Sequence, residues 1–142
     1  MANAWSKKLA TALVTAIKAD GGIHTVAEDR IYPMGSIVNP TYPYLTYVLP
    51  LADRPRHVYA GNSPVSEDVW FQVDGWAATY SSCVDVMDAV LAALDGKTLT
   101  ITSWGVPRLE ATGGMAISDY EIGGVKYWRG MRRYRAILAG TT

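Results

Sequence analysis

Charged residues are scarce in this sequence, and neither sign is in excess. Asp, Glu, Lys and Arg make up 18% of the 142 residues, and 13 basic residues balance 13 acidic ones. Proteins that attract nucleic acid or an anionic membrane surface ordinarily carry a basic excess, so its absence argues against both roles. The low charge content also leaves surface for other chains to cover, and a net charge of zero weakens resistance to self-association.

Cysteine and long apolar runs are scarce as well. Cys83 is the single cysteine, which excludes a disulfide within the chain and fits a reducing compartment. No apolar run approaches the ~20 residues that a membrane-spanning helix needs. The first residues lead into an amphipathic stretch and do not resemble a signal peptide. We therefore expect no membrane association and a protein that is made and folded in the cytoplasm.

Patterns typical of catalysis, metal binding and nucleotide binding are missing. His24 and His57 lie far apart in the sequence, whereas a metal site needs three or four convergent ligands. The glycine pairs form neither a dinucleotide-binding fingerprint nor a phosphate loop. Cys83 falls on the apolar face of a predicted helix, where a thiol behaves as a buried hydrophobe. We predict no catalytic residue, no cofactor and no metal, and a protein that is not an enzyme.

Two segments have the periodicity of amphipathic helices. From Ala4 to Lys18, large apolar residues recur at every fourth position, and Asp20-Gly21-Gly22 is expected to end the helix. From Cys83 to Leu94, apolar residues recur at alternating spacings of three and four. Ser82 is the predicted N-cap of this second helix, and Gly96 is its predicted end.

Strands and loops are predicted for most of the remaining chain. Six of the seven prolines lie between positions 33 and 64, where proline excludes helix interiors and central strand positions. Alternation of apolar and polar residues predicts further strands, and the stretch 52–67 is expected to be a long loop or an extended hairpin arm. The predicted strands before the C-terminal region are 30–32, 44–49, 69–74 and 98–104.

The C-terminal region is predicted to be a hairpin. Gly123-Gly124 fits a two-residue turn between 120–122 and a closing strand over 126–138. In that strand, Arg132 has the parity of the apolar positions, so Gly130 is expected to mark a bulge that shifts the register. The element order predicts an α+β fold, a mainly antiparallel sheet with two helices packed on one face. The length predicts a single domain, 1–142.

Arginines interleaved with aromatic residues are the most informative polar feature. Both types are enriched at protein interfaces, both contact single-stranded nucleic acid, and positive charge also keeps an outer strand solvated. All three interpretations stay open at this point. Residues 1–96 carry six basic and ten acidic side chains, and residues 97–142 carry seven and three. These two regions could complement each other either within the fold or between neighbouring subunits. The candidate subunit or partner interface consists of Arg54, Arg56, Tyr59, Trp104, Arg129, Arg132, Arg133 and Arg135.

Three stretches together resemble a known family. They are Arg30-Ile31-Tyr32-Pro33 with Tyr42-Pro43-Tyr44-Leu45-Thr46-Tyr47, then 69–77 running into the helix that ends Val90-Leu91-Ala92-Ala93-Leu94, and finally Arg132-Arg133-Tyr134-Arg135-Ala136-Ile137-Leu138. In this order they resemble the tail-completion proteins of long-tailed bacteriophages, also called tail terminators or tail-to-head joining proteins. The resemblance covers about 9–138 and includes no catalytic signature.

The resemblance implies a virion structural protein of the tail or neck, assembled in the host cytoplasm. Such proteins form a homo-oligomeric ring, commonly of six copies, that stops growth of the tail tube and docks to the neck. The implied partners are further copies of this chain, the tail-tube protein and a neck or head-completion protein. Genomic DNA would pass through the lumen without sequence-specific binding. The family has no catalytic residues to transfer to this chain.

The sequence leaves three other functions open. The first is a neck or head-completion connector subunit that docks on the portal side. The second is a small nucleic-acid-binding module that uses the arginines between positions 129 and 135. The third is an enzyme, which no motif in the sequence supports.

Overall fold

The structure is a computed structural model, and it describes residues 4–36, 40–55, 59–60, 63–64, 66–101 and 108–139. Three helices and seven strands lie within these ranges. The helices are α1 (Ala4–Ala19), α2 (Gly21–Ala27) and α3 (Tyr80–Leu94). The strands are β1 (Ile31–Pro33), β2 (Tyr44–Pro55), β3 (Tyr59–Ala60), β4 (Ser63–Pro64), β5 (Ser66–Ala77), β6 (Arg108–Ile122) and β7 (Val125–Ala139).

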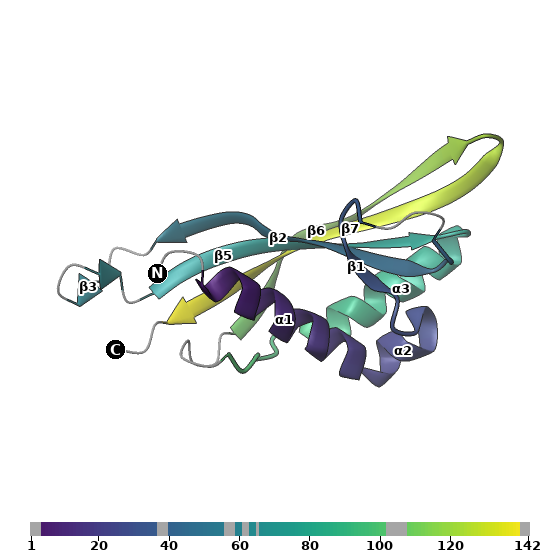
Figure 1. The fold of residues 1–142 in the computed structure, drawn as a ribbon. Coiled ribbons are helices and arrows are strands. Elements are labelled where there is room, and N and C mark those ends of the chain that lie inside the picture. The colour runs from purple at the N-terminus through teal and green to yellow at the C-terminus, as the bar shows by residue number, and fades with distance from the viewer. Residues whose placement is uncertain are drawn as a thin grey trace.

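Five of the strands form one sheet, in the order β1-β2-β5-β7-β6. β1 pairs with β2 in parallel, and the other three pairs are antiparallel. β3 and β4 form a separate two-stranded pair, which lies at the end of the long β2–β5 hairpin. All three helices pack on one face of the large sheet (Figure 1).

The predicted fold class needs a correction, although the fold is α+β. The sheet is mixed, because β1 runs parallel to β2, and three helices pack on it where two were expected. The alternation of side chains along a strand predicts which face each side chain occupies but carries no information about strand direction, so the parallel pair was not foreseen.

The missed helix is α2, which is only seven residues long. Residues Gly21 and Gly22 were expected to end α1, but they begin α2 immediately after it. Asp20 caps the new helix, since its Oδ1 accepts a hydrogen bond from the Ile23 N–H at 2.9 Å. This carboxylate satisfies a backbone donor that the helix itself leaves unpaired, which is why two glycines can start a helix here.

The start of α3 is also earlier than predicted. Thr79, not Ser82, is the N-cap: its hydroxyl oxygen accepts a hydrogen bond from the Ser82 N–H at 3.1 Å. The helix ends at Leu94, and Gly96 follows with φ of 73°, a left-handed conformation that glycine adopts without steric cost.

The core lies between the helices and the covered face of the sheet. The predicted faces of α1 and α3 supply it, together with alternate residues of the strands, and Phe71 stacks on Tyr134 with ring centroids 5.4 Å apart. Full burial of one such aliphatic or aromatic side chain contributes about 1.5–3 kcal/mol. The largest buried side chains are Tyr134, Phe71, Leu9, Leu13, Ile17, Ile23, Leu45, Met87, Leu94, Leu109 and Val69.

Gly130 allows close packing and does not mark a bulge as predicted. The β5–β7 pairing continues without a shift from Ser66↔Ala139 to Ala77↔Trp128. A Cβ atom at Gly130 would collide with Met87 of α3 and would lie 3.2 Å from the Cys83 sulfur. The glycine therefore lets α3 approach the sheet, and Arg132 keeps the parity of the helix-facing residues.

The hairpin between β6 and β7 is confirmed. Gly123 and Gly124 both have positive φ, 60° and 81°, as a two-residue turn of this kind requires, and Ile122 pairs with Val125 across it. Residues 120–127 pair only within the hairpin, because the last β5 residue, Ala77, pairs with Trp128. This two-stranded end, here called the arm, extends beyond the sheet (Figure 1).

Two other predicted segments have mixed outcomes. β2 and β5 pair as far as Pro55↔Glu67, which agrees with an extended hairpin arm over part of 52–67. A strand was predicted over 98–104, but Thr98 forms only an isolated bridge with Arg108. Leu99 and Ile101 are nonetheless buried, and residues 102–104 of this predicted strand lie outside the described residues.

Candidate interface on the uncovered sheet face

The second face of the large sheet is covered by none of the described helices, and we call it the open face (Figure 1). Strand alternation decides which residues reach it. Gly130 contacts α3, so the β7 residues of opposite parity, which include Arg129, Arg133 and Arg135, belong to the open face. The register then adds the β5 residues Asp74 and Trp76 to the same face.

An aromatic cluster occupies the part of the open face that leads to the arm. Tyr44 lies parallel to Trp76 with ring centroids 5.9 Å apart, and Tyr127 lies 5.9 Å from the same indole. Tyr120 stacks on Tyr127 at 5.4 Å. Such pairs contribute roughly 0.5–1.5 kcal/mol beyond their buried area. The complete cluster is Tyr32, Tyr42, Tyr44, Trp76, Tyr120 and Tyr127.

A buried ion pair lies beside this cluster. The Asp74 carboxylate is fully buried and accepts hydrogen bonds from Arg129 Nε at 3.1 Å and Nη2 at 2.6 Å. Burial disfavours the charged guanidinium, but hydrogen bonds and attraction to Asp74 outweigh it, so the pKa of Arg129 is raised. The guanidinium carbon also lies 4.8 Å from the centre of the Trp76 ring, a cation–π contact.

The ion pair is part of a wider polar network. The Gln72 side-chain amide donates a hydrogen bond to Asp74 Oδ1 at 2.8 Å, and Arg133 Nε donates to Gln72 Oε1 at 3.5 Å. Further along β7, Arg135 donates to Glu110 at 2.6 Å and lies 4.0 Å from Asp68. Arg129 and Arg135 are therefore held in place and compensated by acidic neighbours, whereas Arg133 is exposed and held only weakly.

Two tyrosines of the cluster, Tyr42 and Tyr44, keep their protons to higher pH than a free tyrosine. Burial raises the pKa of Tyr44 to about 12, and the neighbouring Tyr42 and Tyr127 add to the rise while Arg129 opposes it. Burial likewise raises the pKa of Tyr42. Trp76 donates its indole N–H to the Thr46 hydroxyl at 2.9 Å, so this polar atom is satisfied too.

The predicted interface residues fall into four groups. Arg129, Arg133 and Arg135 are brought together on the open face, whereas Arg132 lies on the helix-facing side, where no described residue accepts a hydrogen bond from its Nε. For Arg54 of β2 and Tyr59 of β3, the structure describes the backbone only, and two other predicted residues lie outside the described residues: Arg56 and Trp104.

The prediction missed Asp74, Trp76 and the tyrosines of the open face. A signal was present, because Asp74 and Trp76 share a parity in the alternating stretch that became β5. The sequence did not show that this parity would face away from the helices with Arg129 directly beside it. That proximity follows from the β5–β7 register.

The described residues show neither a metal site nor a reactive thiol. No group of three or more His, Cys, Asp or Glu among them is placed to hold a metal ion. None of the helices in the described ranges is long and apolar enough to cross a membrane. Burial raises the pKa of the Cys83 thiol, the opposite of what a reactive thiolate needs.

Comparison with known proteins decides the family. The family described as "Tail completion protein gp17" matches residues 11–139. The chain belongs to this family. Membership confirms the resemblance found in the sequence and makes the chain a structural protein of the virion tail.

A solved structure supports the fold of this tail completion protein. The chain is similar to a chain of a structure described as "Virion of native gene transfer agent (GTA) particle", with a TM-score of 0.69 and 15% identity. The match covers 93% of this chain and 95% of the other, so the two share nearly the whole fold. No curated protein matches the sequence.

Proposed function

We propose that this tail completion protein forms a homo-oligomeric ring, six copies in number, that terminates the tail tube and joins it to the head or neck. The observation that carries the proposal is the open face, an ordered surface of aromatic rings and arginines that no described helix covers. The number six rests on the family resemblance alone. The ring belongs to the tail or neck of a virion and assembles in the host cytoplasm.

The composition of the open face supports a role in protein contacts. Tyrosine, tryptophan and arginine are the residues that contribute most to binding at protein interfaces. The rings stack on each other, and Arg129 and Arg135 are fixed by carboxylates, so binding a partner costs little additional side-chain entropy. A ring needs two different surfaces on each subunit, and the open face is the proposed first one.

The electrostatics of the open face favour a protein partner over nucleic acid. Phosphate binding depends on uncompensated positive charge. Asp74 compensates Arg129, and Glu110 compensates Arg135. Genomic DNA is accordingly proposed to pass through the lumen of the ring without sequence-specific contacts.

Light scattering and negative-stain imaging of the full chain test the proposal. We expect ring-shaped particles of one size, either for the protein alone or after addition of purified tail tubes, with the ring at one end of each tube. A chain that remains monomeric at every concentration and does not attach to tail tubes would contradict the proposal.

A connector subunit on the portal side is the second candidate. The fold is shared with a chain of a gene transfer agent virion, and this likeness is compatible with a position in the tail or in the neck. Pull-down with purified tail-tube protein and with head-completion protein separates the two candidates. Capture of the head-completion protein alone would favour the connector, and capture of the tail-tube protein would favour the terminator.

A further inference from the structure

The arm consists of two strands with no third described strand beside them. Residues 120–127 pair only within the hairpin, because β5 ends at Ala77, which lies opposite Trp128. A two-stranded hairpin on its own is marginally stable in water, and a third strand or a packed face is needed to stabilise it. Pairing within the arm therefore does not by itself set the direction in which the arm leaves the sheet.

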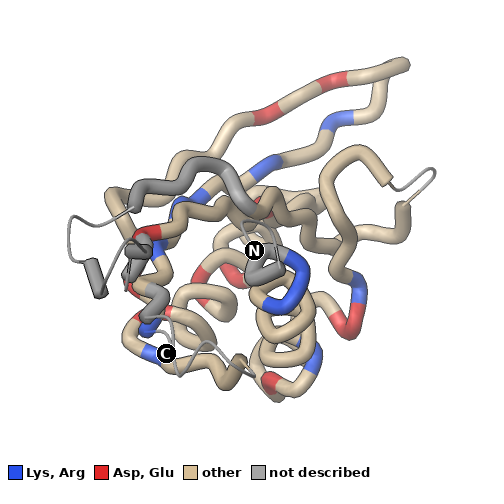
Figure 2. Tube along the Cα trace, turned by 60° about the vertical axis from the view of Figure 1, so that its left-hand side comes forward, with Lys and Arg blue, Asp and Glu red and all other residues tan. Residues whose placement is uncertain are grey.

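Charged side chains join the two strands of the arm to each other. Lys126 Nζ lies 3.2 Å from Asp119 Oδ2 and 5.3 Å from the centre of the Trp128 ring, and Glu121 is the register partner of Lys126. Figure 2 shows acidic positions along one strand of the hairpin and basic positions along the other. These contacts hold the hairpin together but do not connect it to the rest of the sheet.

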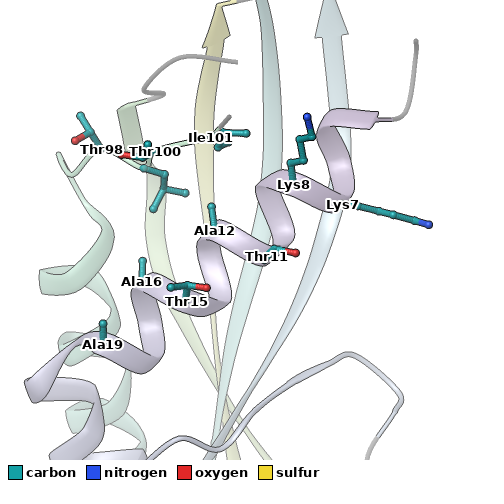
Figure 3. A pocket seen from close by; sticks show the side chains of 11 residues that line it. Lys7, Lys8, Thr11, Ala12, Thr15, Ala16, Ala19, Thr98, Thr100 and Ile101 are labelled. Carbon is teal, nitrogen blue, oxygen red and sulfur yellow. The ribbon is translucent and has the colours of Figure 1, made fainter. Parts of the chain in front are cut away.

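On the helix side, packing reaches the base of the arm. Tyr80, at the start of α3, meets Trp128 edge to face with ring centroids 5.4 Å apart. Beyond this base the side chains that share the parity of Trp128 are charged and exposed. The groove between α1 and residues 98–101 lies toward the other end of β6, since Thr98 bridges to Arg108 (Figure 3).

On the open face, three ring contacts join the arm to other segments of the chain. The ring centroid of Tyr127 lies 5.9 Å from that of Trp76 in β5 and 6.2 Å from that of Tyr42, just before β2. The Tyr120 ring lies 6.5 Å from Trp76. Tyr120 and Tyr127 are register partners and stack on each other, so both strands of the arm are attached through one pair of rings.

Trp76 is a fixed support for this pair of rings. Its indole N–H donates to the Thr46 hydroxyl at 2.9 Å, and Tyr44 lies parallel to it at 5.9 Å. The Arg129 guanidinium lies 4.8 Å from the same ring and is itself held by two hydrogen bonds to the buried Asp74. All of these neighbours belong to the sheet outside 120–127, so the position of the indole does not depend on the arm.

We propose that the rings of Trp76 and Tyr42 brace the arm and hold residues 120–127 in one direction relative to the sheet. Without this brace, the arm bends at its base and frays, while the rest of the sheet keeps its pairing. The brace also fixes the position of the tip residues Ile122 and Val125, which are 68% and 64% exposed. A protrusion that is already oriented binds at a lower entropic cost than a mobile one. The brace is a property of the single subunit and does not depend on the proposed ring.

Distances between two spin labels test the brace. Cys83 is fully buried, so the natural thiol is not labelled. Val125→Cys places one label at the tip of the arm, and Asp88→Cys places the other at an exposed position of α3. The labelled chain is mixed with an excess of unlabelled chain, so that only distances within one subunit contribute to pulsed double electron–electron resonance. The natural brace should give one narrow distance distribution, and a broad one would overturn the proposal.

Two substitutions remove the brace, one from each side. Tyr127→Leu deletes two of the three ring contacts from the arm and leaves the other neighbours of Trp76 in place. Trp76→Leu deletes two of them from the sheet. Each substitution should at least double the width of the distance distribution. An unchanged width in the folded Tyr127→Leu protein would contradict the brace, whether or not Trp76→Leu folds.

The matched control removes a ring of the same cluster that does not support the arm. Tyr32 lies at the far side of the cluster, and its ring contact is with Tyr44 at 6.4 Å. Tyr32→Leu should leave the distance distribution narrow. Equal broadening by Tyr32→Leu and Tyr127→Leu would show a general loosening of the cluster and would overturn the specific role of Trp76 and Tyr42.

Amide hydrogen exchange separates a released arm from a destabilised fold. In the Tyr127→Leu protein, the amides of residues 119–126 should exchange at least tenfold faster than in the natural chain, because a hairpin without its packed face frays. The amides of residues 69–73 should keep their rates, since β5 is paired on both sides. Equally faster exchange in both segments would indicate a loss of global stability and would contradict the proposal.

Discussion

Asp74 and Arg129 are 55 positions apart in the sequence, yet the fully buried carboxylate of Asp74 accepts two hydrogen bonds from the guanidinium of Arg129. Removal of one partner from a buried ion pair leaves an uncompensated charge and typically costs about 3–5 kcal/mol. We expect Arg129→Ala to lower the free energy of unfolding by about that amount, because the remaining carboxylate is fully buried.

Denaturant unfolding measures this effect, with Arg133→Ala as the control. Arg133 is exposed and makes only a 3.5 Å contact with Gln72, so its removal should change the free energy of unfolding by less than about 0.5 kcal/mol. Equal effects of the two substitutions would show that the buried carboxylate does not need its partner.

Gly130 should not tolerate a side chain. Gly130→Ala places a methyl group against the buried Met87, and overpacking of this kind costs about 1–3 kcal/mol. Gly114→Ala is the control, since nothing lies within 4 Å of a Cβ there and the residue is exposed. Thermal unfolding compares the two variants, and no difference between them would contradict the close approach of α3.

The N-cap of α3 can be identified by two hydroxyl deletions. Thr79→Ala removes the acceptor for the Ser82 N–H and should cost about 1 kcal/mol. Ser82→Ala removes the cap that the sequence predicted and should have little effect, because Ser82 contributes its backbone and not its hydroxyl to the capping bond. Denaturant unfolding that ranks the two variants in the reverse order would restore the sequence-based assignment.

Tyr44 should make stability fall at high pH. The folded protein holds the pKa of Tyr44 at about 12, above its ordinary value of 10.0. The contribution of the Tyr44 hydroxyl to the free energy of unfolding is therefore complete below pH 10. It is lost as the pH rises toward 12, because the tyrosine in the unfolded chain releases its proton first. Tyr44→Phe should give a flatter profile of unfolding free energy over this range than the natural chain. Identical slopes for the two proteins would exclude Tyr44 as the cause.

Arg133 offers a test of the open face that leaves the fold intact. Arg133→Glu reverses an exposed charge among the compensated arginines and should reduce ring formation or attachment to tail tubes by about tenfold, which corresponds to roughly 1.4 kcal/mol. Lys18→Glu, on the exposed side of α1, should have no such effect. Sedimentation with tail tubes measures attachment, and equal attachment of both variants would argue against the open face as an interface.

The sequence by itself determined the elements that depend on neighbours along the chain. The periodicity of apolar residues placed α1 and most of α3, and Gly123-Gly124 placed the hairpin turn. These features follow from local backbone preferences and from the need to bury one face of a helix. A short stretch of sequence is therefore enough to predict them. The family resemblance was also carried by such local patterns.

Only the tertiary structure decided which residues meet. It placed β1 parallel to β2, set Asp74 beside Arg129 across β5 and β7, and put Arg132 on the opposite face from the other three arginines. Parity along one strand separates two sets of side chains, but packing of the helices selects which set is buried, and strand register selects its partners. The open face and its network therefore arise from contacts between distant segments, which no local pattern encodes.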